Sequence, residues 1–308
     1  MAVSVLRRKP IPERVFGVSR YAARRRTRAA LVRAAVASLV VVSALACSRT
    51  APQASQPIVA VSVAPQAYVV KKIAGDLVGV NVTLPPGVEA HSYEPSLKVL
   101  SAISNASLYV KVGHPKFAFE QTWLGELLRD RPSLPVVDSM RGVVVDEGDP
   151  HVWLAPSHVR AMARNIAEAL SRLMPEHRDE IAHGLQSFES EVNTLDEDIR
   201  RSFAGRHGNR FFVFHPAWSY FAKEYGLEQV AIEREGREPD PKALAAIISQ
   251  ARAAGVRIIY VQPQVSASSA RLIADEIGAR LETIDPLAYE WTENLRNVAQ
   301  KIAQGLVE

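Results

Sequence analysis

The sequence predicts an α/β protein made of two lobes with mostly parallel sheets, joined by one long rigid helix. Short β-branched runs alternate with helical patterns over residues 58–173 and again over residues 211–308, as in βαβ units. Between these regions, residues 176–203 form one charged helical pattern, about 40 Å long at 1.5 Å per residue. A helix of that length and charge typically lies across a surface or joins two lobes.

In the first region, short apolar runs bounded by turn residues predict strands, and apolar residues three or four positions apart predict helices. The expected strands are 58–63, 80–84, 108–112 and 136–137, and the expected helices are 65–77, 97–103, 117–128 and 157–173. Pro85, Pro86 and Gly87 end the second of these strands. We therefore expect residues 58–174 to form an N-terminal α/β lobe.

The alternation restarts after the long charged pattern. The expected strands are 211–214, 230–232, 258–261 and 281–284, and the expected helices are 220–225, 242–254, 267–277 and a last helix from residue 292. Apolar residues at helical spacing mark the inner side of the long helix: Ile181, Leu185, Phe188, Val192, Leu195 and Ile199. These patterns predict a linking helix over 175–204 and a C-terminal α/β lobe over 205–308.

Residues 1–47 are typical of a signal peptide. The apolar stretch 34–46 follows a basic region and is too short to span a bilayer. The single cysteine of the chain, Cys47, comes directly after it, which favours a lipoprotein signal with an acylated Cys47 over plain secretion. Polar residues 48–57 then form a flexible tether. The protein is expected outside the cytoplasm, either periplasmic or lipid-anchored on the outer face of the cytoplasmic membrane, with the lipid as its only membrane attachment.

The net charge of +4 comes from the N-terminus. Residues 1–47 hold ten basic residues and one acidic residue, and the remaining chain holds 27 basic and 32 acidic residues, a net charge of −5. A partner with a phosphate backbone requires a basic surface, so the composition argues against a nucleic-acid partner.

Three histidines and one aspartate share a position at predicted strand ends: His91, His151, His215 and Asp285. Ligands bind at the carboxyl ends of strands in open α/β sheets, and three imidazoles with one carboxylate suit four-coordinate zinc. Their spacings of 60, 64 and 70 residues form no local motif, and the chain contains no HExxH or CxxC. His114 is a second candidate, whereas His158, His177, His183 and His207 are expected to be solvated.

Around these residues the sequence resembles the zinc/manganese family of solute-binding proteins that supply metal ABC importers. The matching segments run in order from residue 58 to the C-terminus: 86–95, 149–154, 212–215, 220–227, 255–264 and 284–287. The resemblance implies two α/β lobes joined by a rigid helix, with the metal between them. It also implies that His91, His151 and His215 are metal ligands.

The resemblance implies a non-enzymatic, monomeric protein that binds zinc with high affinity and delivers it to the membrane permease. Asp285 is the expected fourth ligand, with Glu290 or water as alternatives. A histidine at position 215 favours zinc, although manganese and iron stay open. Glu94 and Trp153 are candidate neighbours of the site.

Two other functional classes are consistent with these residues. Three histidines and an open position also describe a zinc hydrolase, for which Glu94 would be the base. A surface adhesin lipoprotein is the other class. The lack of a GxSxG motif argues against a Ser-His-Asp hydrolase.

Overall fold

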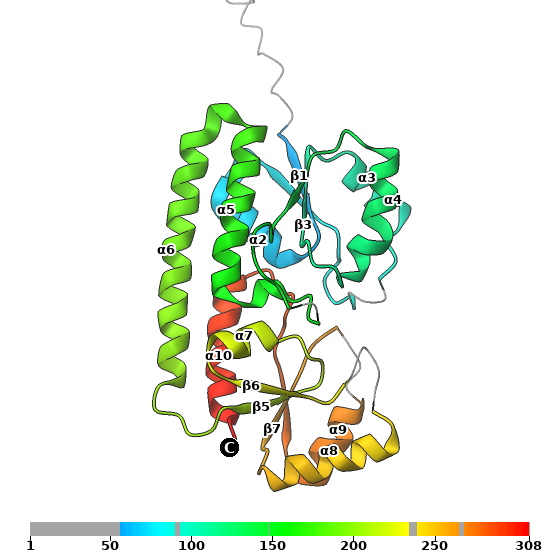
Figure 1. Cartoon of the computed structure of the whole chain (residues 1–308), viewed down its shortest axis with the longest axis vertical. Helices are drawn as coiled ribbons and strands as arrows, with labels where there is room; N and C mark the ends of the chain where they lie inside the picture. The colour runs from blue at the N-terminus through cyan, green and yellow to red at the C-terminus, as the bar shows by residue number, and fades with distance from the viewer. Residues whose placement is uncertain (1–55, 90–92, 147, 234–238, 265–267, 308) are drawn as a thin grey trace, which may run out of the picture. The chain divides into compact units, whose positions relative to one another are not determined.

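A computed structural model of the chain describes residues 56–89, 93–146, 148–233, 239–264 and 268–307 (Figure 1). The predicted signal peptide with Cys47, and residues 48–55 of the predicted tether, lie outside the described residues. No helix in the described ranges is long and apolar enough to cross a membrane. The folded part consists of two α/β lobes, one on each side of a long helix in the sequence, as predicted.

Each lobe contains a four-stranded sheet whose neighbouring strands all pair in parallel. The strands are β1 Ile58–Val61, β2 Gly79–Val82, β3 Leu108–Lys111, β4 Val136–Asp138, β5 Arg210–Val213, β6 Glu228–Ala231, β7 Ile258–Val261 and β8 Arg280–Thr283. The spatial orders are β2-β1-β3-β4 and β6-β5-β7-β8, so both lobes share one topology. The order reverses between β1 and β3 and between β5 and β7, and such switch points are where open α/β sheets bind ligands.

The helices also follow the predicted pattern, with end residues that differ by a few positions. They are α2 Ala64–Ala74, α3 Leu97–Ser104, α4 Gly125–Asp130, α5 Pro156–Leu173, α6 Arg178–Phe203, α7 Ser219–Glu224, α8 Pro241–Ala253, α9 Ser268–Ile277 and α10 Trp291–Gly305. The predicted helix 117–128 differs most, because Glu120–Leu124 is a turn of π-helix that leads into α4. Asp240 caps α8 by accepting a hydrogen bond from Ala243 N at 2.8 Å.

The long helix α6 packs against helices of both lobes. Its buried residues are those that the periodicity predicts, except that Leu185 is only partly buried. Helices α2 and α5 contact its first part and α10 contacts its last part, as Figure 1 shows. The Tyr68 hydroxyl on α2 bonds Glu191 Oε1 of α6 at 2.6 Å and Thr292 Oγ1 of α10 at 3.1 Å. Through these contacts α6 fixes elements of the two lobes to one another.

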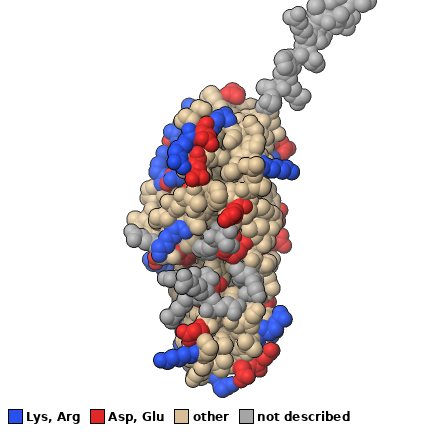
Figure 2. Space-filling view, turned by 90° about the vertical axis from the view of Figure 1, so that its right-hand side faces the viewer, with Lys and Arg blue, Asp and Glu red and all other residues tan. Residues whose placement is uncertain are grey.

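Basic and acidic side chains are mixed on the surface of the described chain. Figure 2 shows basic and acidic side chains together on one face, with broad uncharged areas between the charged groups. Several of them form exposed ion pairs, such as Arg129 with Glu126 and Arg164 with Glu189. Pairs of this kind are worth about 0–1 kcal/mol, so the fold depends on its apolar core rather than on these contacts.

Gly184 is the point of closest approach between α6 and α2. A Cβ atom at this position would lie 2.1 Å from the carbonyl oxygen of Ile73. Because that neighbour is main chain, it cannot move aside without shifting α2. The glycine within the long helix is therefore required for helix packing.

Replacing Gly184 by alanine should lower the free energy of unfolding by about 1–3 kcal/mol, because the added methyl group overpacks the helix contact. Gly125→Ala is the matched control, since nothing lies within 4 Å of a Cβ at that helical position. Alanine there should stabilise the fold by up to about 1 kcal/mol. Urea unfolding of the three proteins measures both effects, and a neutral Gly184→Ala would contradict the close approach.

Glu120 is a buried carboxylate next to the end of β3. Its Oε1 accepts hydrogen bonds from Ser62 Oγ and Val112 N, both at 2.5 Å, and its Oε2 accepts one from Gly113 N at 2.9 Å. The Tyr109 hydroxyl bonds Ser62 Oγ at 2.8 Å. Burial raises the pKa of Glu120 to about 7, although these hydrogen bonds oppose the change. Glu120 thus holds the turn that leaves β3 and titrates near neutrality.

This raised pKa makes stability depend on pH. Between about pH 4.5 and pH 7 the folded chain retains a proton at Glu120 that the unfolded chain has lost, so stability falls as pH rises. Relative to Glu120→Gln, the parent should therefore lose about 1–3 kcal/mol of unfolding free energy between about pH 5 and pH 8. Urea unfolding at both pH values tests this, with the exposed Glu126→Gln as control. Identical pH dependence in parent and Glu120→Gln would refute the prediction.

Candidate metal centre

His151 lies in the connection between β4 and α5 and is only 7% exposed. Asp149 holds it at two points: Oδ1 accepts from the His151 main-chain N at 2.9 Å and bonds the ring Nδ1 at 2.6 Å. A 3₁₀ turn, Val152–Leu154, follows directly. The sequence Asp-Pro-His thus forms a short loop in which the aspartate orients the imidazole.

His215 leaves β5, the strand at the switch point of the second sheet, and is also 7% exposed. Its Nδ1 lies 3.1 Å from Oε1 of Glu233, a buried residue that follows β6. The Glu233 main-chain N donates to Phe214 O at 2.9 Å, which extends the pairing of the two strands beyond their ends. Strand pairing therefore places this carboxylate beside this imidazole.

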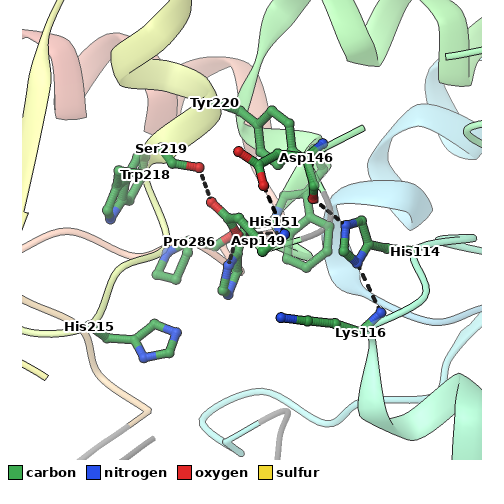
Figure 3. Close-up of polar contacts among 12 residues, drawn as sticks. His114, Lys116, Asp146, Asp149, His151, His215, Trp218, Ser219, Tyr220 and Pro286 are labelled. Atoms are coloured by element: carbon green, nitrogen blue, oxygen red, sulfur yellow. Dashed lines mark hydrogen bonds and ion pairs between the residues drawn. The ribbon is translucent and has the colours of Figure 1, made fainter. Parts of the chain in front are cut away.

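The structure brings His151 and His215 together from the two lobes. Their ring centroids lie 5.2 Å apart at an interplanar angle of 79°, and Figure 3 shows both rings at the same junction. The two residues are 64 positions apart in the sequence. The two imidazoles are therefore neighbours, although their loops follow strands of different sheets.

The carboxylates select one form of each imidazole. Burial raises the pKa of Asp149, but hydrogen bonds and charge attraction from His151, together with a hydrogen bond from Ser219, outweigh it and lower the pKa overall. An ionised Asp149 only accepts hydrogen bonds, so the Nδ1 of His151 carries a proton, and in the neutral imidazole the lone pair then lies on Nε2. Glu233 makes the corresponding contact with the Nδ1 of His215, at 3.1 Å instead of 2.6 Å. Imidazoles oriented by carboxylates in this way are typical of metal ligands.

Two tryptophans connect the His151 loop to the C-terminal lobe. The Trp153 indole N–H donates to Pro286 O at 2.7 Å, and the Trp291 indole N–H donates to Trp153 O at 2.8 Å. Both indoles are at most 1% exposed. The ring of Trp153 also contacts His151, with centroids 5.4 Å apart. Trp153 is therefore both a core residue and a neighbour of the site, whereas Glu94 is exposed.

The remaining predicted ligands are less fully defined. His91 lies outside the described residues. Asp285 follows β8 and is half-buried, and its Oδ1 accepts from Leu287 N at 2.9 Å and from Gln264 Nε2 at 2.6 Å. Glu290 is exposed at the start of α10. Among the residues that the structure describes, no three His, Cys, Asp or Glu side chains form a group that could hold a metal ion.

The comparison with known families agrees with this arrangement. A family model described as zinc-uptake complex component A, periplasmic, matches residues 59–305. The chain belongs to this family. Its members are binding components of importers, so the prediction that the chain is not an enzyme is confirmed and the hydrolase alternative is set aside.

Curated members of this zinc-uptake family resemble the chain at modest identity. It is 27% identical over 240 residues to the high-affinity zinc uptake system protein ZnuA of Bacillus subtilis, which covers 70% of this chain and 74% of that protein. It is 24% identical over 275 residues to the zinc-binding lipoprotein AdcA of Streptococcus pneumoniae, covering 82% of this chain. The match covers 54% of AdcA, so the chain spans about half the length of that relative.

Solved structures show the same fold. A crystal structure of ZnuA is 38% identical, has a TM-score of 0.78 and covers 82% of this chain and 99% of its own. The laminin-binding protein Lmb of Streptococcus agalactiae, described as an adhesin with metal transporting activity, is 29% identical with a TM-score of 0.72. That match covers 81% of this chain and 99% of Lmb. The predicted two-lobe α/β fold is confirmed.

The structure gives His114 and His158 surroundings that differ from those predicted. His114 is fully buried: its Nδ1 accepts from Lys116 N at 3.1 Å, so its Nε2 donates to Asp146 O, 2.7 Å away. With both ring nitrogens bonded to main chain, it is a structural residue and not a second ligand. The prediction that His158 is solvated is wrong. This residue is half-buried 4.9 Å from the Tyr220 ring, and burial lowers its pKa.

Sequence reasoning missed the carboxylates that orient the imidazoles. Asp149 stands two positions before His151, a spacing at which an aspartate often bonds the main chain two residues on, so a local signal existed. Glu233 directly follows the predicted strand 230–232, which also is a strand-end position. Ser219, whose hydroxyl donates to Asp149, carries no such signal because the contact joins residues 70 positions apart.

Trp153→Phe should lower the free energy of unfolding by about 1–3 kcal/mol, because it removes the donor to Pro286 O at a buried position. Trp123→Phe is the matched control. Trp123 is half-buried in the π-helical turn and takes no part in the junction. Urea unfolding compares the two variants, and equal losses would mean that the indole bond contributes nothing specific.

Proposed function

We propose that the chain is an extracytoplasmic, high-affinity zinc-binding protein that delivers zinc to the permease of an ABC importer. The observation that carries this proposal is the pair of buried imidazoles, His151 and His215, each bonded to a carboxylate at the junction of the lobes. Membership in the zinc-uptake family and a 38% identical ZnuA structure support it.

The proposed ligands are His91, His151 and His215, with Asp285 in the fourth position and Glu290 or water as alternatives. Asp285 directly precedes Pro286, whose carbonyl oxygen accepts the hydrogen bond of Trp153, and the ring of Trp153 contacts His151. His91 would come from the loop that follows β2. Three nitrogens and one oxygen form the four-coordinate shell that zinc commonly adopts in proteins.

The donor set favours zinc over manganese as cargo. Manganese prefers oxygen-rich shells, whereas imidazole suits zinc, and zinc binds a given nitrogen site more tightly than manganese does. Asp149 and Glu233 place negative charge behind the two imidazoles, which offsets the charge of a buried divalent cation. Manganese and iron remain the alternatives.

Delivery requires that the protein stay outside the cytoplasm and near the membrane. We propose that residues 1–47 are a lipoprotein signal, that an acylated Cys47 anchors the chain, and that residues 48–57 form a tether. The folded part would act as a monomer, with an N-terminal lobe at 58–174, a linking helix at 175–204 and a C-terminal lobe at 205–308. The AdcA relative, a zinc-binding lipoprotein, supports the anchored form.

Surface adhesion is a second function, because Lmb is described as an adhesin as well as a metal transporter. No feature of the described ranges distinguishes an adhesive surface from the rest of the protein. The imidazole pair, in contrast, has a direct chemical use in zinc binding. We therefore place zinc delivery first.

Competitive zinc titration of the metal-stripped chain tests the proposal. The parent should bind one zinc tightly, and His91→Ala, His151→Ala and His215→Ala should each weaken binding by more than the roughly 10–100-fold that loss of an outer partner costs. The exposed His207→Ala should keep the parent's affinity.

Asp285→Asn and Glu290→Gln, measured in the same titration, identify the fourth ligand by which of them weakens binding. Tight binding of manganese but not zinc would change the cargo and keep the site. Retention of the parent's zinc affinity in all three histidine variants would overturn the site.

A further inference from the structure

The segment that carries His151 lies before α6 in the sequence but is bonded largely to elements after it. We define the His151 segment as residues 146 and 148–157, which include the end of the β4–α5 connection and the first residues of α5. By sequence it belongs to the N-terminal lobe. Its polar contacts show which elements of the two lobes position the imidazole of His151.

Helix α7 of the C-terminal lobe contacts the His151 segment at three places. The Tyr220 hydroxyl accepts from Asp146 N at 2.8 Å and donates to Asp146 O at 3.1 Å, and the Ser219 hydroxyl donates to Asp149 (Figure 3). At the far end, Ser157 N and Oγ donate to Glu224 at 3.1 and 2.8 Å. One short helix thus holds the beginning, middle and end of the segment.

The last strand connection and α10 add two buried contacts between Trp153 and the C-terminal lobe. Pro286 O accepts from Trp153, and Trp291 donates to Trp153 O. From the N-terminal lobe, His114 donates to Asp146 O and the Phe117 ring meets Trp153 edge-on, with centroids 6.0 Å apart. The contacts nearest to His151 are those of Asp149 and Trp153, and most of these are with residues of the C-terminal lobe.

We infer that His151 and His215 form a preset pair carried by the C-terminal lobe, and that Ser219 and Tyr220 are the positioning residues that keep His151 in it. Ser219 acts through Asp149, which fixes the imidazole, and Tyr220 acts through the main chain of Asp146. The inference deepens the proposed function and rests on it for the identity of the ligand, a divalent zinc ion.

A preset pair has a consequence for how zinc binds. Two nitrogens already stand in position before the metal arrives, so the cost of ordering them is included in folding.

Ser219→Ala and Tyr220→Phe test the positioning role without touching the proposed ligands. Each should weaken zinc affinity about 10-fold, as loss of an outer partner does. Tyr225→Phe is the matched control, because its hydroxyl bonds Asp196 Oδ1 of α6 at 2.9 Å rather than a residue of the His151 segment. The parent's affinity in both test variants would overturn the inference.

A second measurement needs no metal. In the histidine-labelled, metal-free chain, nitrogen–proton correlation spectra should show His151 and His215 each as a single form protonated at Nδ1. Ser219→Ala and Tyr220→Phe should shift or broaden the signals of His151 and leave those of His215, which Glu233 holds. Unchanged His151 signals would refute a preset pair that depends on α7.

The two measurements separate the inference from the function on which it rests. A parent with ordered imidazoles that binds no zinc would refute the proposed cargo but leave the preset pair standing. A parent that binds zinc tightly, with test variants indistinguishable from it in both measurements, would refute only the positioning role.

Discussion

Two indole N–H groups hold the junction between the lobes, and the candidate metal centre lies directly beside them. The indole N–H groups of Trp153 and Trp291 are buried and therefore need hydrogen-bond acceptors. Each donates to a main-chain carbonyl oxygen more than a hundred residues away in the sequence. Because a misplaced lobe would leave these groups unbonded, the bonds make one arrangement of the junction far more favourable than others. The geometry of His151 relative to His215 depends on that arrangement.

The duplicated topology explains why the centre forms at this junction. In both sheets the second strand in the sequence pairs with one edge of the first strand, and the third strand pairs with its other edge. This reversal of direction creates a switch point in each lobe. His215 leaves the second sheet at its switch point. In the first sheet, the corresponding position is filled by the buried Glu120 cluster and by His114, which are fully bonded to the protein itself. The chain thus uses one switch point for structure and the other for one of its candidate ligands, His215.

Buried carboxylates serve different purposes at these two places. Glu120 accepts main-chain hydrogen bonds and keeps a turn closed, and burial moves its pKa close to neutrality. Asp149 accepts from the imidazole of the candidate ligand His151, and hydrogen bonds keep the pKa of Asp149 low. The difference follows from the partners: the hydrogen bonds to Glu120 come from neutral N–H and hydroxyl groups, whereas Asp149 also gains electrostatic attraction from the imidazole of His151.

The sequence by itself determined the order and type of nearly every element, because apolar periodicity and turn residues act over a few neighbouring positions. It also singled out His151 and His215, since both stand where a strand or loop ends. It named Trp153 as a neighbour of the site, but it could not predict that the Trp153 indole bonds Pro286 O, that Glu233 bonds His215 and Ser219 bonds Asp149, or that the ring of His158 meets Tyr220 edge-on. Those contacts join residues 18 to 133 positions apart, and only the packing of complete helices and sheets brings them within hydrogen-bonding or van der Waals distance.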